Sequence, residues 1–214
     1  MRSLRIIFIG LALLCASLSA LGAVYKPLTE AQAAEAIQKI DASCAGIKSL
    51  KADFKQVKDI AILNEKMVST GKMWFSGGML RWEYVSPYTY LFILNKEKVL
   101  LQSSQTSSKM DVNSNRLFKS IARIIMNSIT GQGLSGSGDF KVKMFLDGGC
   151  YVAELEPLKK EMKQMFSTIR LRFDSKRRMV SQVEMNEKRG GVTVITLKDI
   201  KTNETINQNL FTLH

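Results

Sequence analysis

Histidine is the scarcest functional residue here: the 214-residue chain has one, His214, and it is the last residue. Nucleophilic triads and histidine-containing zinc sites depend on imidazole side chains, so the sequence excludes both. Carboxylate pairs such as Glu154 and Glu156 share one face of a strand, but any strand reaches that spacing by chance. We therefore expect no catalytic residue, no metal site and no cofactor, and a protein that is not an enzyme.

A nucleotide-binding loop in its proper setting is also missing. Residues 131–136 match G-x-G-x-x-G, but the dinucleotide site needs a strand before this loop and a helix after it. A helical pattern precedes the loop here and a strand pattern follows, so the glycines indicate a flexible connection. The net charge of +12 comes from scattered cations that acids interrupt, without a basic and aromatic stacking motif. This argues against nucleic acid and leaves solvated strand faces, an anionic membrane surface or an acidic partner.

Long apolar runs are absent except near the start. Ile6 to Ala20 carries no charge, follows two arginines and ends at a small-x-small site, Ala20-Leu21-Gly22. This pattern predicts a signal peptide over residues 1–22 and export of the mature chain. Residues 23–214 are then long enough for a single domain with a real core.

Cysteine is scarce as well, with three in the chain. Cys15 lies in the predicted signal peptide, and the Leu14 before it is not the small residue that lipoprotein acylation needs. We therefore expect no lipid anchor. Cys44 and Cys150 remain, and an oxidising compartment would allow a bridge between them, with two buried thiols as the alternative.

The rest of the chain is dominated by strand patterns. Thr29 to Gln32 has the sequence of a capping box, which predicts a first helix over residues 30–45. A second amphipathic helix is predicted over residues 114–129, in the middle of the strands. Short turns make successive strands antiparallel, so the fold class is mostly β (α+β), one large curved antiparallel sheet with helices across one side.

The strands between Gly71 and Asn95 are unusual because they are apolar on both faces. Leu80, Trp82 and Tyr84 lie on one face of their strand, while Met79 and Val85 lie on the other. A sheet with one face in water alternates cleanly instead, so something must cover the second face. The sequence also has eleven methionines, several of them in strands, and methionine adapts to partners of varied shape. Together these features predict a pliable cavity.

A series of short motifs carries a family resemblance over nearly the whole mature chain. They are Phe54-Lys55-Gln56, Gly71-Lys72-Met73-Trp74-Phe75, Leu80-Arg81-Trp82-Glu83-Tyr84 followed by Pro87, Asp139-Phe140, Leu155-Glu156-Pro157 and Phe211. In this order and spacing they resemble the LolA family of periplasmic lipoprotein carriers. The resemblance implies an unclosed antiparallel β half-barrel of roughly ten or eleven strands with a helical lid over the concave face.

The resemblance also implies a function. Proteins of this kind are soluble periplasmic carriers that bind the acyl chains of lipoproteins released from the inner membrane and deliver them to the outer membrane. The implied partners are acylated lipoproteins, an inner-membrane ABC transporter and an outer-membrane acceptor, and the implied state is a monomer. The alternative is a related half-barrel that binds another lipid or glycolipid, or acts as a periplasmic envelope sensor.

The implied lipid-binding cavity can be assigned to residues. From the sheet we choose Phe54, Trp74, Leu80, Trp82, Tyr84, Leu91 and Ile93, and from the lid Ile37, Ile40, Phe118, Ile121 and Ile125. A one-residue bulge exchanges the two faces of a strand, so Met73, Phe75, Phe92 and Leu94 are the alternative lining.

The latch of the lid departs from the family pattern. In well-known relatives, an arginine in the turn after the strand that holds Trp74 ties the lid to the sheet. Here that turn is Ser76-Gly77-Gly78. Arg81 is the nearest arginine and the candidate latch, and an ion pair with Glu83 or with an acid of a neighbouring strand is its alternative role.

Overall fold

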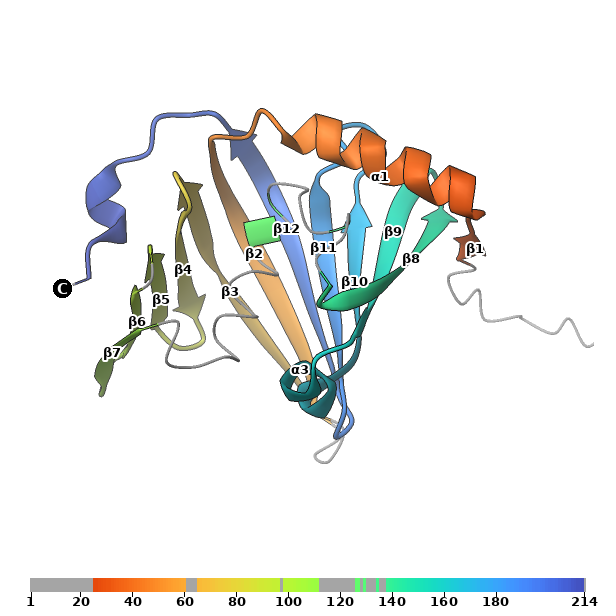
Figure 1. Cartoon of the computed structure of the whole chain (residues 1–214). Helices are drawn as coiled ribbons and strands as arrows, with labels where there is room; N and C mark the ends of the chain where they lie inside the picture. Colours follow the sequence, from red (N-terminus) through yellow and green to blue (C-terminus); the bar gives the residue numbers. More distant parts are fainter. Residues whose placement is uncertain are drawn as a thin grey trace, which may run out of the picture.

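The computed structural model describes residues 25–60, 65–96, 98–111, 126–127, 129, 134 and 138–213. These residues form one antiparallel sheet of twelve strands that curves into an open trough (Figure 1). The predicted signal peptide lies outside the described residues, and so does most of the helix predicted over residues 114–129.

The strands follow one another in two runs. They are β1 (Lys26–Pro27), β2 (Ser49–Ile60), β3 (Glu65–Ser76), β4 (Met79–Ser86), β5 (Tyr90–Asn95), β6 (Lys98–Ser103), β7 (Ser107–Asp111), β8 (Phe140–Asp147), β9 (Cys150–Pro157), β10 (Phe166–Phe173), β11 (Val180–Glu187) and β12 (Val192–Thr202). Their order across the sheet is β1-β8-β9-β10-β11-β12-β2-β3-β4-β5-β6-β7. The first run, β2 to β7, therefore joins the second through the β12–β2 pair, and the outermost strands β1 and β7 leave the sheet unclosed.

This arrangement confirms the half-barrel fold class with a small difference in strand number. The sheet has twelve strands rather than ten or eleven, because it includes the two-residue strand β1 and the five-residue strand β7 at its edges. Strands this short carry little alternation, so a sequence pattern detects them poorly.

Helix α1 (Glu30–Cys44) lies across one end of the trough (Figure 1). Its capping box is formed as predicted: the Gln32 N–H donates to Thr29 Oγ1 at 3.4 Å, and the Thr29 N–H donates to Gln32 Oε1 at 3.1 Å. Ala36, Ile40 and Cys44 form its buried stripe. We call this end of the trough the α1 end.

The opposite end of the trough holds helix α3 (Lys160–Met165), which packs against β9 and β10 (Figure 1). Met162 is 1 % exposed and anchors this short helix, and the Lys188 N–H donates to the Met165 carbonyl at 2.7 Å. We call this end the α3 end. Within the described residues no helix is both long and apolar enough to cross a bilayer.

Two hydrophobic clusters pack against opposite faces of the sheet. The concave cluster is the larger one and joins α1 to the inner face, with Ile40, Leu50, Met73, Leu80 and Phe173 among its buried members. The convex cluster lies behind β3 to β6 and centres on Ile93, Leu100, Ile206 and Phe211. The two-sided apolar pattern thus has a cover on each face.

The cover on the convex face is the C-terminal strap, residues 203–213, which includes the 3-10 helix η2 (Gln208–Phe211) and lies outside β4 and β5 (Figure 1). The strap makes a hydrogen bond to each of four consecutive strands. These join Asn203 N to Ser49 O (2.9 Å), Gln208 Nε2 to Ser76 Oγ (3.3 Å), Arg81 Nη1 to Leu210 O (3.2 Å) and Asn95 Nδ2 to Phe211 O (3.0 Å). The strap therefore ties β2, β3, β4 and β5 together from behind.

Both cysteines of the described chain are free thiols. Cys44 is buried in α1, and its Sγ lies 3.9 Å from the Arg178 carbonyl. Burial raises the pKa of the Cys44 thiol to about 11, so it stays protonated at neutral pH.

Gly71 generates a test of this packing. A methyl group at Gly71 would overlap the Glu83 carbonyl and come within 2.5 Å of the Phe54 ring, whereas one at Gly46 meets nothing within 4 Å. We expect Gly71→Ala to lower the free energy of unfolding by about 3 kcal/mol and Gly46→Ala to leave it within about 0.5 kcal/mol. Urea unfolding followed by circular dichroism measures both. Equal effects of the two substitutions would contradict the close approach at Gly71.

Candidate functional site

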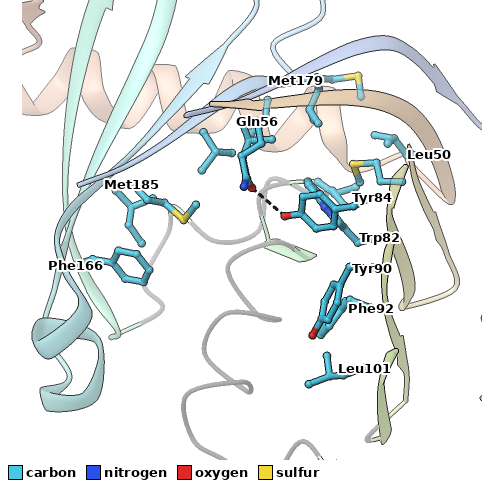
Figure 2. A pocket seen from close by; sticks show the side chains of 17 residues that line it. Leu50, Gln56, Trp82, Tyr84, Tyr90, Phe92, Leu101, Phe166, Met179 and Met185 are labelled. Atoms are coloured by element: carbon cyan, nitrogen blue, oxygen red, sulfur yellow. Dashed lines mark hydrogen bonds between the residues drawn. The ribbon is translucent and has the colours of Figure 1, made fainter. Parts of the chain in front are cut away.

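The inner face of the sheet encloses an apolar cavity of about 360 Å³. Its lining residues come from both runs of strands, as Figure 2 shows. They are Leu50, Gln56, Met73, Trp82, Tyr84, Tyr90, Phe92, Leu101, Ile129, Phe166, Ile169, Met179, Val180, Val183, Met185, Ile195 and Leu197. Eight are aromatic or methionine side chains and eight are aliphatic. The volume falls within the usual range of small-molecule sites.

Strand register decides which side chains reach this cavity. Trp82 on β4 lies directly opposite Met73 on β3 and Phe92 on β5. Directly opposite residues of antiparallel strands share a face, so the three side chains form one row across the inner wall. The next row, Trp74, Arg81 and Ile93, faces the convex side.

Four of the predicted cavity residues lie on the concave face. Trp82 and Tyr84 line the cavity directly. Phe54 supports them from β2, with its ring centroid 4.4 Å from that of Trp82 and 5.1 Å from that of Tyr84. Leu80 is fully buried in the concave cluster.

The other three predicted residues, Trp74, Leu91 and Ile93, belong to the convex cluster behind the sheet. The strand register corrects their predicted placement in the cavity. On β3 and β5, the residues next to them in sequence are the ones that face the concave side. Of the alternative set, Met73 and Phe92 line the cavity, and Phe75 and Leu94 are buried in the concave cluster. Sequence alone did not show this because every one of these positions is apolar.

The predicted lid residues are described only in part. Ile40 is fully buried, and Ile37 packs beside it against the concave cluster, so α1 covers the α1 end of the inner face. Phe118, Ile121 and Ile125 lie outside the described residues. Ile129, near the end of the second predicted helix, lines the cavity and is 6 % exposed.

Arg81 lies on the convex face, and its role as a lid latch is corrected. Its Nε and Nη2 donate to Glu83 Oε2 at 2.9 and 2.8 Å, and its Nη1 donates to the Leu210 carbonyl of the strap. The guanidinium carbon also lies 5.9 Å from the Trp74 ring centroid. Arg81 therefore binds the C-terminal strap, because strand alternation turns it away from the cavity that Trp82 faces.

Sequence reasoning missed the polar group of the wall. Gln56 lines the cavity and is 8 % exposed, and the Tyr84 hydroxyl donates to its Oε1 at 2.9 Å (Figure 2). Burial, with Tyr88 nearby, raises the pKa of Tyr84 to about 12, so the hydroxyl keeps its proton at neutral pH. The signal for Gln56 was present, since it continues the alternation of Ala52 and Phe54 on β2.

The second run of strands supplies a wall that was also missed. Phe166 and Met185 lie across the cavity from Trp82 and Tyr90 (Figure 2). Ile169, Met179 and Ile195 also line it. Within the described residues, no group of three or more His, Cys, Asp or Glu side chains is placed to hold a metal ion. The fold and site define a class: an open β half-barrel with an apolar cavity in its inner face.

Comparison with known proteins identifies the family. The family model described as "Outer membrane lipoprotein carrier protein LolA" matches residues 45–214, and the chain belongs to this family. No curated protein matches the sequence.

Several solved structures resemble the chain at low sequence identity. An uncharacterised conserved protein from Thermus thermophilus has a TM-score of 0.50 and 8 % identity, over 83 % of this chain and 91 % of that chain. A LolA superfamily protein from Nitrosomonas europaea has a TM-score of 0.44 and 12 % identity, over 84 % and 97 %. The Mycobacterium tuberculosis lipoprotein LppX has a TM-score of 0.49 and 9 % identity, over 84 % and 99 %. At 8 % identity, the likeness to the Thermus thermophilus protein shows the fold alone.

Trp82 and Val85 provide a test of the cavity on one strand. Trp82→Asp places a charge inside the apolar wall, whereas Val85, 50 % exposed, gives Val85→Asp a solvated charge. We expect Trp82→Asp to reduce binding of an apolar fluorescent dye at least tenfold while the far-ultraviolet circular dichroism stays native. Val85→Asp should bind the dye as the original protein does. Unfolding of Trp82→Asp together with loss of binding would show that Trp82 is only a core residue.

Proposed function

We propose that this protein is a periplasmic carrier that encloses the acyl chains of lipoproteins released from the inner membrane and delivers them to the outer membrane. The observation that carries the proposal is the aromatic and methionine-lined cavity in the inner face of a LolA-family half-barrel. The predicted signal peptide over residues 1–22 supports export to the periplasm.

The energetics of acyl chains explain why such a carrier needs this cavity. Each methylene group removed from water is worth about 0.8 kcal/mol, so free chains cannot cross an aqueous compartment on their own. Methionines at Met73, Met179 and Met185 add flexible, polarisable surface to the wall. A wall of this kind accepts chains of different length and saturation.

Release must cost little once an acceptor is present. The position of the transfer equilibrium depends on the difference between the affinities of carrier and acceptor for the acyl chains. The carrier must therefore bind the chains less tightly than the acceptor does. The trough is unclosed, and α1 closes its α1 end mainly through apolar side chains such as Ala36 and Ile40. Because Arg81 binds the C-terminal strap, opening the cavity would not require breaking its hydrogen bonds.

The proposal assigns binding and transfer, with no chemical step. The partners are acylated lipoproteins, an inner-membrane ABC transporter that releases them and an outer-membrane acceptor that receives them, and the carrier acts as a monomer. Apolar contacts within a cavity discriminate weakly among chains. The protein part of the cargo and the docking partners would then set the direction of transfer.

A release assay tests the proposal. Protein comprising residues 23–214 is mixed with membranes that hold the ABC transporter and a triacylated lipoprotein, ATP is added, and the membranes are sedimented. We expect ATP-dependent lipoprotein in the supernatant in a one-to-one complex with the carrier, and none with Trp82→Asp. Val85→Asp is the matched control and should release lipoprotein normally.

The same assay separates the second candidate, a half-barrel that binds another lipid or glycolipid or acts as an envelope sensor. That candidate predicts no lipoprotein in the supernatant and a different amphiphile in mass spectra of the protein purified from its host. A co-purified lipid with a sugar or phosphate head, absent from Trp82→Asp, would favour it over the carrier.

A further inference from the structure

The wall of the cavity changes polarity along strand β2. Its concave-facing side chains, from the α1 end to the α3 end, are Leu50, Ala52, Phe54, Gln56 and Lys58. The first three are apolar and at most 4 % exposed, and Gln56 is a neutral amide. Lys58 forms an ion pair with Glu187 at 3.1 Å. Along β2, the concave-facing side chains thus change from apolar to neutral polar and then to charged.

At each of these two levels one neighbouring strand also carries a polar side chain. Opposite Gln56, β3 presents Ser69, which is 1 % exposed and donates to the Tyr88 hydroxyl at 3.3 Å. Opposite Lys58, β12 presents Thr193, whose hydroxyl donates to Glu187 Oε1 at 3.1 Å. On the other side of β2 the partner is apolar at both levels, Ile195 of β12 opposite Gln56 and Met67 of β3 opposite Lys58. The polar groups therefore follow β2 and one adjacent strand at each level, between the apolar part of the cavity and the α3 end.

The amide of Gln56 has unused donor capacity. The Tyr84 hydroxyl donates to Oε1, and Nε2 donates no hydrogen bond to any of the described residues. Gln56 is also the one amide among the described residues that line the cavity. Because this amide lies in an otherwise apolar wall and its N–H groups are free to donate, the position favours a ligand that supplies a neutral acceptor.

We propose that Gln56 Nε2 donates a hydrogen bond to the ester or amide carbonyl of an acylated ligand, whose hydrocarbon chains extend toward the α1 end and whose head lies toward the α3 end. The inference rests on the acyl-chain binding proposed above. It adds the residue that binds the carbonyl group and the orientation of the ligand in the cavity. A neutral carbonyl suits the site because Lys58, the cation on the same face of β2, is already paired with Glu187.

Matched glycerol probes isolate this hydrogen bond. Dioctanoylglycerol carries two ester carbonyls, and dioctylglycerol has ether linkages in their place with similar chains. Binding of each is measured by displacement of an apolar dye. The protein should bind the ester about fivefold more tightly than the ether, the value expected for one net neutral hydrogen bond.

Substitution assigns the preference to one side chain. Gln56→Met keeps the length of the side chain and removes the amide, and it should reduce the ratio of ester to ether affinity to about one. The matched control is Gln182→Met, at a position on β11 opposite Arg172 and therefore on the convex face. It should keep the full preference. Ester preference that persists in Gln56→Met would overturn the assignment.

A spectroscopic readout covers the case in which Gln56→Met does not fold. The infrared band of an isotope-labelled ester carbonyl shifts to lower frequency when the oxygen accepts a hydrogen bond. In the unsubstituted protein we expect the shifted band for bound dioctanoylglycerol. A band at the frequency found in hydrocarbon solvent would overturn the inference without any variant.

The outcomes also separate this inference from the function on which it rests. Equal binding of ester and ether overturns the role of Gln56 and leaves acyl-chain binding intact. Failure of both probes to bind would count against acyl-chain binding itself, and the role of Gln56 would fall with it.

Discussion

The cavity depends on the missing side chain at Gly71. At this point of β3 the Phe54 ring of β2 lies against the backbone, and the register of β3 against β4 shifts between Thr70 and Gly71. A glycine inside a strand permits such an approach, and an aromatic ring across it restores the lost packing. Phe54 can then hold Trp82 and Tyr84 as one aromatic wall. The position of the inner wall follows from a contact that any larger residue would prevent.

The C-terminal strap is the second constraint, and it acts from outside. Its hydrogen bonds reach Ser49, Ser76, Arg81 and Asn95, one residue in each of four neighbouring strands. Phe211, fully buried, fills the space behind them. An open sheet has no closing strand pair to fix its curvature, so ties across its back are a physical substitute. The strap therefore holds β2 to β5 at the angle at which Trp82 and Phe92 face the other half of the cavity.

The sequence predicted the fold class, α1 with its capping box and the two-sided apolar strands, because these depend on local patterns. It predicted Phe54, Leu80, Trp82 and Tyr84 on the correct face, since polar residues alternate with them. Alternation is missing at Trp74-Phe75 and from Leu91 to Leu94, where both faces are buried. There only register assigns a face, and register is a long-range property. The same reason explains Arg81: its sequence neighbours face the cavity, and its partner Leu210 lies 129 residues away.

The wall opposite Trp82 could not be predicted from the motifs of the first strands, because it comes from β10, β11 and β12, far along the chain. Its contribution changes how the cavity should be understood. The two walls are joined through the β12–β2 pair. No strand pair links the outer edges β1 and β7, so separating these edges breaks no strand pairing. A ligand bound in an apolar cavity between such walls stabilises the closed arrangement, because each buried methylene group of the ligand contacts both walls. The polar side chains of Gln56 and Lys58 limit this gain along β2, whereas Met185 and Phe166 keep the facing wall apolar. On the β2 side the geometry therefore favours ligands whose apolar part ends at Gln56.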